Sequence, residues 1–253
     1  MKFNLTPFIL GLITLFSFSC SSDDSSNDPS DPPTEIQRFI ESITVVSAQD
    51  PAENTTINVT YDTDGKVTSV TDGVDTNLFI YDNGALSNIT GGGDNLNVLE
   101  LYDTPQDAFE FGEVTQYDNN GNPVQLTLLD EEYDWNTNSY TTVVYTAEIS
   151  YDNKPNPYFY TLDAAGIIDA LDNIELNFSS DVQNPQLVQA RMLLPANNPS
   201  MITIKDADNV TTHTVNFDYV YNADDYPTSA SVTATDVMDN STSIYTATYT
   251  YRQ

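Results

Sequence analysis

Apolar and polar side chains alternate along several segments of the chain. In residues 143–151, the odd positions are apolar or aromatic and most even positions are polar. Because successive side chains of a strand point to opposite faces, this pattern predicts a β-strand with one buried and one exposed face. The segments 57–61, 215–221 and 245–251 alternate in the same way, and their Thr, Val, Ile and Tyr residues favour strands.

A tyrosine followed by Asp or Asn and a short turn sequence recurs at the ends of such segments. Asp and Asn accept hydrogen bonds from the backbone that follows them, and glycine adopts a positive φ at little cost, so each copy predicts a hairpin turn. We expect the ring to pack on the sheet with its hydroxyl at the wet rim. The irregular spacing indicates a meander of antiparallel hairpins rather than a solenoid. The copies begin at Tyr61, Tyr81, Tyr117, Tyr151 and Tyr221.

One segment interrupts the strand pattern. Residues 161–172 place Ile167, Ile168 and Leu171 at helical spacing, and Asp163 is positioned to act as an N-cap. We therefore predict a short helix or compact loop between two β halves, with a soft division near residue 160.

The N-terminal segment predicts export and lipid attachment. Lys2 precedes an apolar run, residues 8–18, that has the length of a signal peptide rather than of a membrane span. The run ends at Cys20, the only cysteine, in a sequence that resembles a bacterial lipobox. The implied chemistry is diacylglyceryl transfer to the Cys20 thiol, cleavage before Cys20 and acylation of its new amino group. The alternative is an ordinary cleaved signal peptide with a chance cysteine.

The chain divides into three predicted regions. Residues 1–19 form a lipoprotein signal peptide, residues 20–34 a lipidated cysteine and disordered tether, and residues 35–253 a single antiparallel β domain. The tether is polar and proline-rich and cannot bury a core. Several acyl chains on one residue satisfy the need for more than one hydrophobic anchor. The Ser and Asp run after Cys20 resembles the export signal of Bacteroidota surface lipoproteins. We therefore expect an outer-membrane, lipid-anchored and cell-surface-exposed protein.

The composition excludes several classes of function. With 7 Lys+Arg against 38 Asp+Glu and a formal charge of −31, the 253-residue chain cannot form the basic patch that nucleic acid requires. One Cys and one His exclude disulfide scaffolds and zinc ribbons. The acidic surface favours solubility and opposes direct adhesion to anionic lipid, so contact with the membrane is expected through Cys20 alone.

Residue patterns that could carry catalysis or bind metal have simpler interpretations. His213 lies at the start of a predicted strand without a second His or a nucleophile motif. The acidic pairs 131–132 and 224–225 are expected by chance in so acidic a chain, although carboxylate pairs can hydrolyse glycosides. Segments 62–65 and 72–75 offer oxygen ligands for Ca²⁺, but turn chemistry explains them equally. We assign no catalytic residue, metal ligand or cofactor.

The only tryptophan is the strongest candidate for ligand contact. Trp135 lies in a polar segment between two predicted strands, flanked by Tyr133 and Tyr140. An exposed ring with nearby Asp and Asn side chains can stack on a sugar and bond its hydroxyls. The alternative is that Trp135 folds back over the end of a hairpin.

The chain resembles a family of uncharacterised Bacteroidota lipoproteins that contain a domain of unknown function with a porin-like fold. The resemblance covers residues 40–253. It rests on the Tyr-Asp turns, on residues 151–157 (Tyr-Asp-Asn-Lys-Pro-Asn-Pro) and on residues 221–229, where Asp225 replaces an expected glycine. It implies an all-β fold in which an antiparallel hairpin meander forms a porin-like open or closed barrel with one short helical insertion. It implies no activity, cofactor or catalytic residue.

These observations favour a non-enzymatic binding or interaction module on the outer membrane. Its expected partners are the membrane, through Cys20, and a glycan or an envelope protein. The alternatives are a purely structural envelope lipoprotein and, less favoured, a hydrolase.

Overall fold

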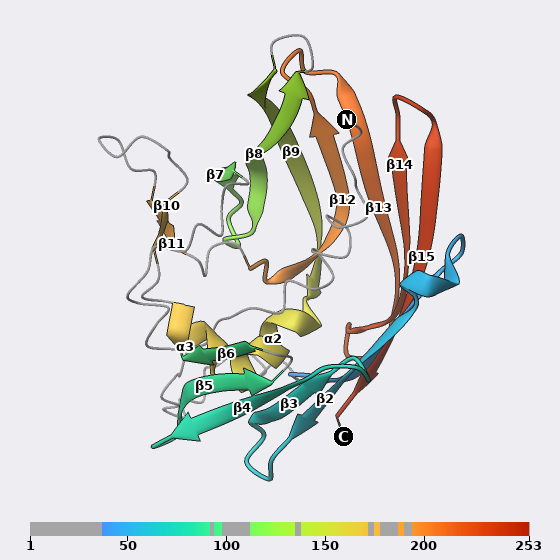
Figure 1. The fold of residues 1–253 in the computed structure, drawn as a ribbon. Helices are drawn as coiled ribbons and strands as arrows, with labels where there is room; N and C mark the ends of the chain where they lie inside the picture. Colours follow the sequence, from blue (N-terminus) through green and yellow to red (C-terminus); the bar gives the residue numbers. More distant parts are fainter. Residues whose placement is uncertain are drawn as a thin grey trace.

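Most of the described chain belongs to one 13-stranded sheet (Figure 1). The computed structural model describes residues 37–91, 94–97, 112–134, 138–171, 175–177, 187–189 and 194–252. All neighbouring strands in the sheet are antiparallel. The strands are β1 (Ile40–Ser47), β2 (Thr55–Tyr61), β3 (Val67–Thr71), β4 (Thr76–Asp82), β5 (Ala85–Gly91), β6 (Asp94–Asn97), β7 (Gly112–Tyr117), β8 (Pro123–Asp134), β9 (Ser139–Pro155), β12 (Asn197–Lys205), β13 (Thr211–Tyr221), β14 (Pro227–Asp236) and β15 (Ser241–Tyr251).

The sheet is an up-and-down meander in which the first strand, β1, pairs with the last strand, β15. The strand order is β6-β5-β4-β3-β2-β1-β15-β14-β13-β12-β9-β8-β7, and its edges, β6 and β7, are consecutive in sequence. Among the described strands, the sheet is therefore a barrel-like meander that is open between β6 and β7. A separate two-stranded ribbon pairs β10 (Glu175–Asn177) with β11 (Leu187–Gln189). The all-β antiparallel prediction is confirmed.

Strand alternation decides which face of the sheet carries the core. In β15, Tyr245, Ala247 and Tyr249 are buried, whereas the intervening Thr246 and Thr248 are exposed. The predicted alternation in β2, β9 and β13 is present as well. The buried positions line the concave side of the curved sheet, where the helices lie (Figure 1).

Two short helices fill part of the concave side. They are α2 (Pro157–Ala164) and α3 (Ile167–Leu171), and among the described residues no helix is long and apolar enough to cross a membrane. The helical insertion is confirmed, but its predicted N-cap, Asp163, is wrong. The cap is Asn156, whose side chain accepts from the N–H of Tyr158, with Pro157 at the first helical position. Gly166, at φ 70°, separates the helices.

Four of the described hairpin turns share one pattern of hydrogen bonds. At Asp118, Oδ1 accepts from the backbone N–H groups of Asn120 and Asn122 at 2.8 and 2.9 Å. The backbone N–H of Asp118 donates to the carbonyl of Asn122, and Gly121 adopts φ 80°. The same bonds surround Asp62, Asn222 and Asp206, and the positive-φ residues there are Gly65, Asp225 and Asn209.

Two of the predicted turns differ from this pattern. After Tyr81, Asn83 and Gly84 form a tight two-residue connection in which both φ angles are positive. The turn predicted after Tyr151 is wrong, because β9 continues to Pro155 and pairs with β12.

The hydroxyls of the repeated tyrosines lie inside the fold, so the predicted wet-rim position is wrong. The hydroxyls of Tyr61, Tyr81 and Tyr151 donate to backbone carbonyls of neighbouring segments. Burial raises the pKa of Tyr61 and Tyr151 well above the usual range, and it raises the pKa of Tyr117 to about 12. The hydroxyls of Tyr61, Tyr81 and Tyr151 thereby join neighbouring segments, whereas the buried hydroxyl of Tyr117 has no hydrogen-bond partner among the described residues.

Candidate functional site

The two ends of the sheet differ in how their turns are held. We call one end the base; it contains the turns 62–66, 118–122 and 222–226 and the junction between β9 and α2. Ile40 pairs with Tyr251 across β1 and β15, so the described chain both enters and leaves the sheet at the base (Figure 1).

The opposite end, which we call the tip, carries exposed apolar side chains on its turns. It contains the turns 206–210 and 237–240 and the paired ends of β8 and β9 at Asp134 and Ser139. Val210 is 52% exposed and Met238 is 72% exposed. The bonds of the turn at Asp206 stay within the turn itself.

Asn122 braces the base by joining two distant segments. It is fully buried, and its Nδ2 donates to Asp118 Oδ2 and to Asn197 Oδ1, both at 2.9 Å. Its Oδ1 accepts from the backbone N–H groups of Ala196 and Asn197 at 2.8 and 3.2 Å. Burial opposes ionisation of Asp118, but the hydrogen bonds from Asn122 and the turn backbone outweigh it and lower the pKa of the carboxyl.

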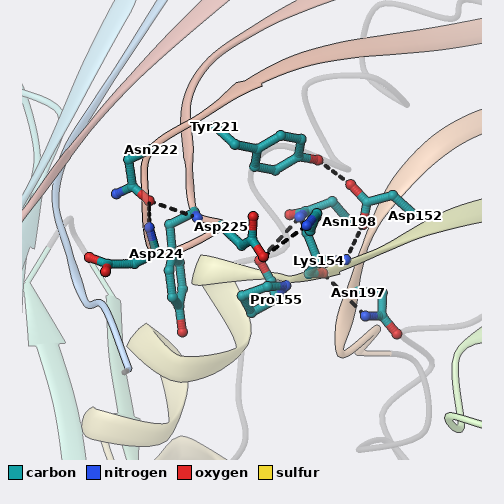
Figure 2. Close-up of polar contacts among 10 residues, drawn as sticks. Asp152, Lys154, Pro155, Asn197, Asn198, Tyr221, Asn222, Asp224 and Asp225 are labelled. Carbon is teal, nitrogen blue, oxygen red and sulfur yellow. Dashed lines mark hydrogen bonds and ion pairs between the residues drawn. The ribbon is translucent and has the colours of Figure 1, made fainter. Parts of the chain in front are cut away.

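Neighbouring amides extend this brace to β9 (Figure 2). Asn197 Nδ2 donates to the carbonyl of Lys154 at 3.2 Å, and Asn198 Nδ2 donates to the carbonyl of Pro155 at 3.1 Å. Asn156 Nδ2 donates at 3.0 Å to the carbonyl of Pro195. The end of β9, the start of α2 and the start of β12 are thereby fixed together. Local sequence patterns did not predict the bridging role of these asparagines. The one feature of the sequence that could have indicated it is the adjacent pair Asn197 and Asn198.

Two ion pairs connect the turn between β13 and β14 to other segments, and Figure 2 shows the one between Asp225 and Lys154. Asp224 accepts from Arg38 Nε at 3.0 Å, and Asp225 lies 2.8 Å from Lys154 Nζ. The adjacent carboxylates therefore have different partners, Arg38 and Lys154. Asp225, which replaces the expected glycine, adopts φ 64° and still forms the turn.

Each basic side chain that the structure describes is engaged. Lys66 contacts the carbonyl of Gly84 and lies 4.8 Å from the ring centroid of Tyr81. Arg252 lies 5.2 Å from the ring centroid of Tyr61. The remaining pairs are Arg38 with Asp224, Lys154 with Asp225 and Lys205 with Glu148.

His213 is a buried residue of β13 near the tip. Its Nδ1 lies 3.0 Å from Thr212 Oγ1, and its Nε2 lies 3.7 Å from Asp236 Oδ2. Burial lowers the pKa of His213, although the charges of Asp236 and Asp239 oppose this. The ring is therefore held neutral at physiological pH, as a packed part of the strand.

The two candidate calcium segments are hairpin turns. Asp62 Oδ1 accepts from the N–H groups of Asp64 and Lys66. Asp72 Oδ1 accepts from Val74 and Asp75, and these backbone bonds lower the pKa of Asp72. The turn interpretation accounts for both carboxylates. Within the part of the chain that the structure describes, no three His, Cys, Asp or Glu side chains are grouped to hold a metal ion.

The residues predicted for lipid attachment and ligand contact are not described by the structure beyond the backbone of Tyr133 and Tyr140. Cys20 and Trp135 lie outside the described residues, as do the side chains of Tyr133, Tyr140 and the pair 131–132. The backbone places Tyr133 and Tyr140 directly opposite each other in the register of β8 and β9, one pair before the tip.

Among known proteins, only solved structures are similar to this chain. No family model matches the chain, and no curated protein matches it. A porin-like protein from Bacteroides uniformis is 10% identical with a TM-score of 0.38, over 84% of this chain and 98% of that chain. A porin-like protein from Bacteroides vulgatus is 11% identical with a TM-score of 0.41, over 85% of this chain and 99% of that chain.

A third structure belongs to a different group of envelope proteins. It is a putative outer membrane lipoprotein-sorting protein domain from Vibrio parahaemolyticus, 8% identical with a TM-score of 0.24, over 86% of each chain. At these scores and identities, the likenesses say nothing about ligand or activity. Two of them carry the porin-like description that the sequence resemblance implied, while membership of that lipoprotein family remains a proposal.

Proposed function

We propose that the protein is a lipoprotein of the outer membrane, attached through acyl chains on Cys20, whose folded part is a non-enzymatic module that binds a glycan or an envelope protein. The observation that carries this proposal is that the two ends of the fold differ: the described chain enters at the base, and the tip lies at the opposite end. The described chain enters at the base, where Arg38 pairs with Asp224, so a tether over residues 20–34 joins the fold at its most cross-linked end. The tip then lies farthest from the anchor.

The tip is the proposed contact region. Thr142 and Val144, near the tip end of β9, are exposed. Val210 and Met238 add exposed apolar surface on the neighbouring turns. Trp135, Tyr133 and Tyr140 would supply the aromatic surface on which a sugar ring or an apolar side chain packs.

Charge supports a ligand without net negative charge. The chain carries a formal charge of −31, and its described basic side chains are engaged in ion pairs or in contacts with carbonyls and rings. An anionic polymer would meet repulsion, without a free cation among the described side chains to offset it.

The anchor is tested by fractionation of cells that express Cys20→Ala. We expect the variant to leave the membrane fraction and to lose incorporation of radiolabelled palmitate, because the acyl chains supply the membrane affinity. Ser21→Ala, which alters the adjacent residue, should behave as the wild type. Continued membrane association of Cys20→Ala would contradict the lipoprotein proposal.

Binding is tested with detergent-extracted full-length protein on a glycan array. We expect Trp135→Ala to lose the signal and Trp135→Phe, which keeps an aromatic ring, to retain most of it. If the wild type binds no glycan, crosslinking on intact cells should capture an envelope protein. Failure of both would leave the purely structural alternative.

A further inference from the structure

The convex face of β1, β15, β14 and β13 is nearly free of charge in a strongly acidic protein. Its outward positions alternate with the buried core positions, and none of them is buried. Glu41, at the bulge of β1, and Asp218 are the charged residues among them. Most of the others are Thr or Ser. The cross-strand rows are Thr44–Thr248–Ser229–Val220, Val46–Thr246–Ser231–Asp218, Ile244–Thr233–Asn216 and Thr242–Thr235–Thr214.

The same face combines hydrogen-bonding groups with isolated apolar side chains. Each hydroxyl can both donate and accept a hydrogen bond. Val220 is 60% exposed, and Val46 and Ile244 are also exposed. Hydroxyls recur about every 4.8 Å across the strands and about every 7 Å along them. We call this set of outward positions the hydroxyl face.

We propose that the hydroxyl face binds an uncharged polysaccharide chain. Sugar hydroxyls donate and accept as Thr and Ser do, and the C–H faces of the rings suit Val46, Val220 and Ile244. An uncharged polymer avoids the repulsion that the rest of the surface exerts on anions. This inference goes beyond the proposed function, which places the contact region at the tip, because it assigns a second binding surface and a ligand class to the same module.

The shape of the face determines which occupant fits. The face lies on the outer side of the curved sheet, opposite α2 and α3 (Figure 1). A second copy would bring two convex surfaces together, whereas a stable interface buries roughly 800 Å² on each partner. A single sugar would bury little surface against a convex face. An extended chain can follow the curvature and add weak contacts along its length, so binding should depend on polymer length.

The test is a pull-down of detergent-extracted full-length protein on insoluble cellulose, β-1,3-glucan and, as an anionic polymer, calcium-gelled alginate. We expect retention on at least one neutral polymer and none on alginate. The disaccharide of the retaining polymer should fail to compete. The variant Thr246→Val/Thr248→Val/Ser231→Ala removes three hydroxyls and should weaken retention at least tenfold, since each net hydrogen bond contributes modestly.

Matched controls separate the hydroxyl face from the rest of the molecule. Thr246→Ser/Thr248→Ser keeps both hydroxyls and should restore retention. Thr63→Val removes an exposed hydroxyl from a base turn and should bind as the wild type. Thermal unfolding of each variant checks that the fold is intact.

Several outcomes would overturn the inference. Retention that is unchanged in the triple variant, or lost only in Trp135→Ala, would move the ligand to the tip and leave the proposed function standing. No retention on either neutral polymer would remove the polysaccharide. A wild type that dimerises, with a monomeric triple variant, would assign the face to a second copy. Release by Cys20→Ala is measured separately, so failure of the anchor is distinguishable from failure of this face.

Discussion

The turns at Asp118 and Asp206 have the same internal hydrogen bonds and different surroundings. In each, the carboxylate accepts from the residues two and four positions later at 2.8 to 3.0 Å. At the base, the fourth residue after Asp118 is the buried Asn122, which bonds to the start of β12. At the tip, the corresponding residue is the exposed Val210. The comparison separates what a turn sequence specifies from what a tertiary brace adds.

The largest effect is expected from removing that brace. Asn122→Ala leaves the backbone N–H groups of Ala196 and Asn197 without their acceptor and should lower the free energy of unfolding by about 3 kcal/mol. Val210→Ala, at the matched position, should change it by less than about 0.5 kcal/mol. Urea unfolding followed by circular dichroism measures both. Equal losses would contradict the comparison.

A smaller effect is expected from the interior tyrosine hydroxyls of the base. The hydroxyl of Tyr151 donates to the carbonyl of Pro123 at 2.7 Å. Tyr151→Phe deletes this bond and should cost about 1 kcal/mol of unfolding free energy. Absorbance titration should also show Tyr151 remaining neutral above pH values at which exposed tyrosines ionise, because burial raises its pKa. Ordinary ionisation of Tyr151 in the folded protein would place the hydroxyl in water.

The ion pair at the base is expected to add less than the asparagine brace. Lys154 and Asp225 are both partly exposed, so their coupling in a double-mutant cycle should stay below about 1 kcal/mol. Asp225→Gly loses the pair but relieves a positive φ, and the net change should lie within about 0.5 kcal/mol. A coupling above about 2 kcal/mol would make the ion pair the main brace.

The smallest effect is expected at the tip, from His213. Burial lowers its folded pKa below the unfolded value of about 6.5, so the unfolded chain binds more protons between those values. Stability should therefore fall as the pH drops through the unfolded-state pKa of about 6.5 toward the lower folded-state pKa. His213→Gln should reduce the slope of unfolding free energy against pH there. An unchanged slope would show that His213 does not titrate on unfolding.

Local patterns in the sequence predict the strands and most turns. The alternation in 143–151 and 245–251 identifies the buried face of each strand, because a one-residue shift in the strand register would move its apolar side chains to the exposed face. The turn at Asp206 was missed because Lys205 stands where other copies have tyrosine. The turn after Tyr151 was predicted wrongly because Tyr-Asp-Asn also fits a strand that continues.

Contacts between distant segments were not predictable from local pattern. Asn122 and Asn197 are 75 residues apart, and neither sequence neighbourhood identifies the other as its partner. The inward direction of the tyrosine hydroxyls likewise depends on which hairpins become neighbours. The hydroxyl face needs the full strand order, because its rows combine positions from β1 with positions from β13, β14 and β15.

The most direct measurement is native-state hydrogen exchange of two matched backbone amides. The N–H of Asn122 donates to Asp118 Oδ1 and the N–H of Val210 donates to Asp206 Oδ1, both at 2.9 Å. We expect the Asn122 amide to exchange only with global unfolding and the Val210 amide to exchange far faster, through local opening of the tip. Equal protection of the two amides would contradict a braced base and a self-contained tip.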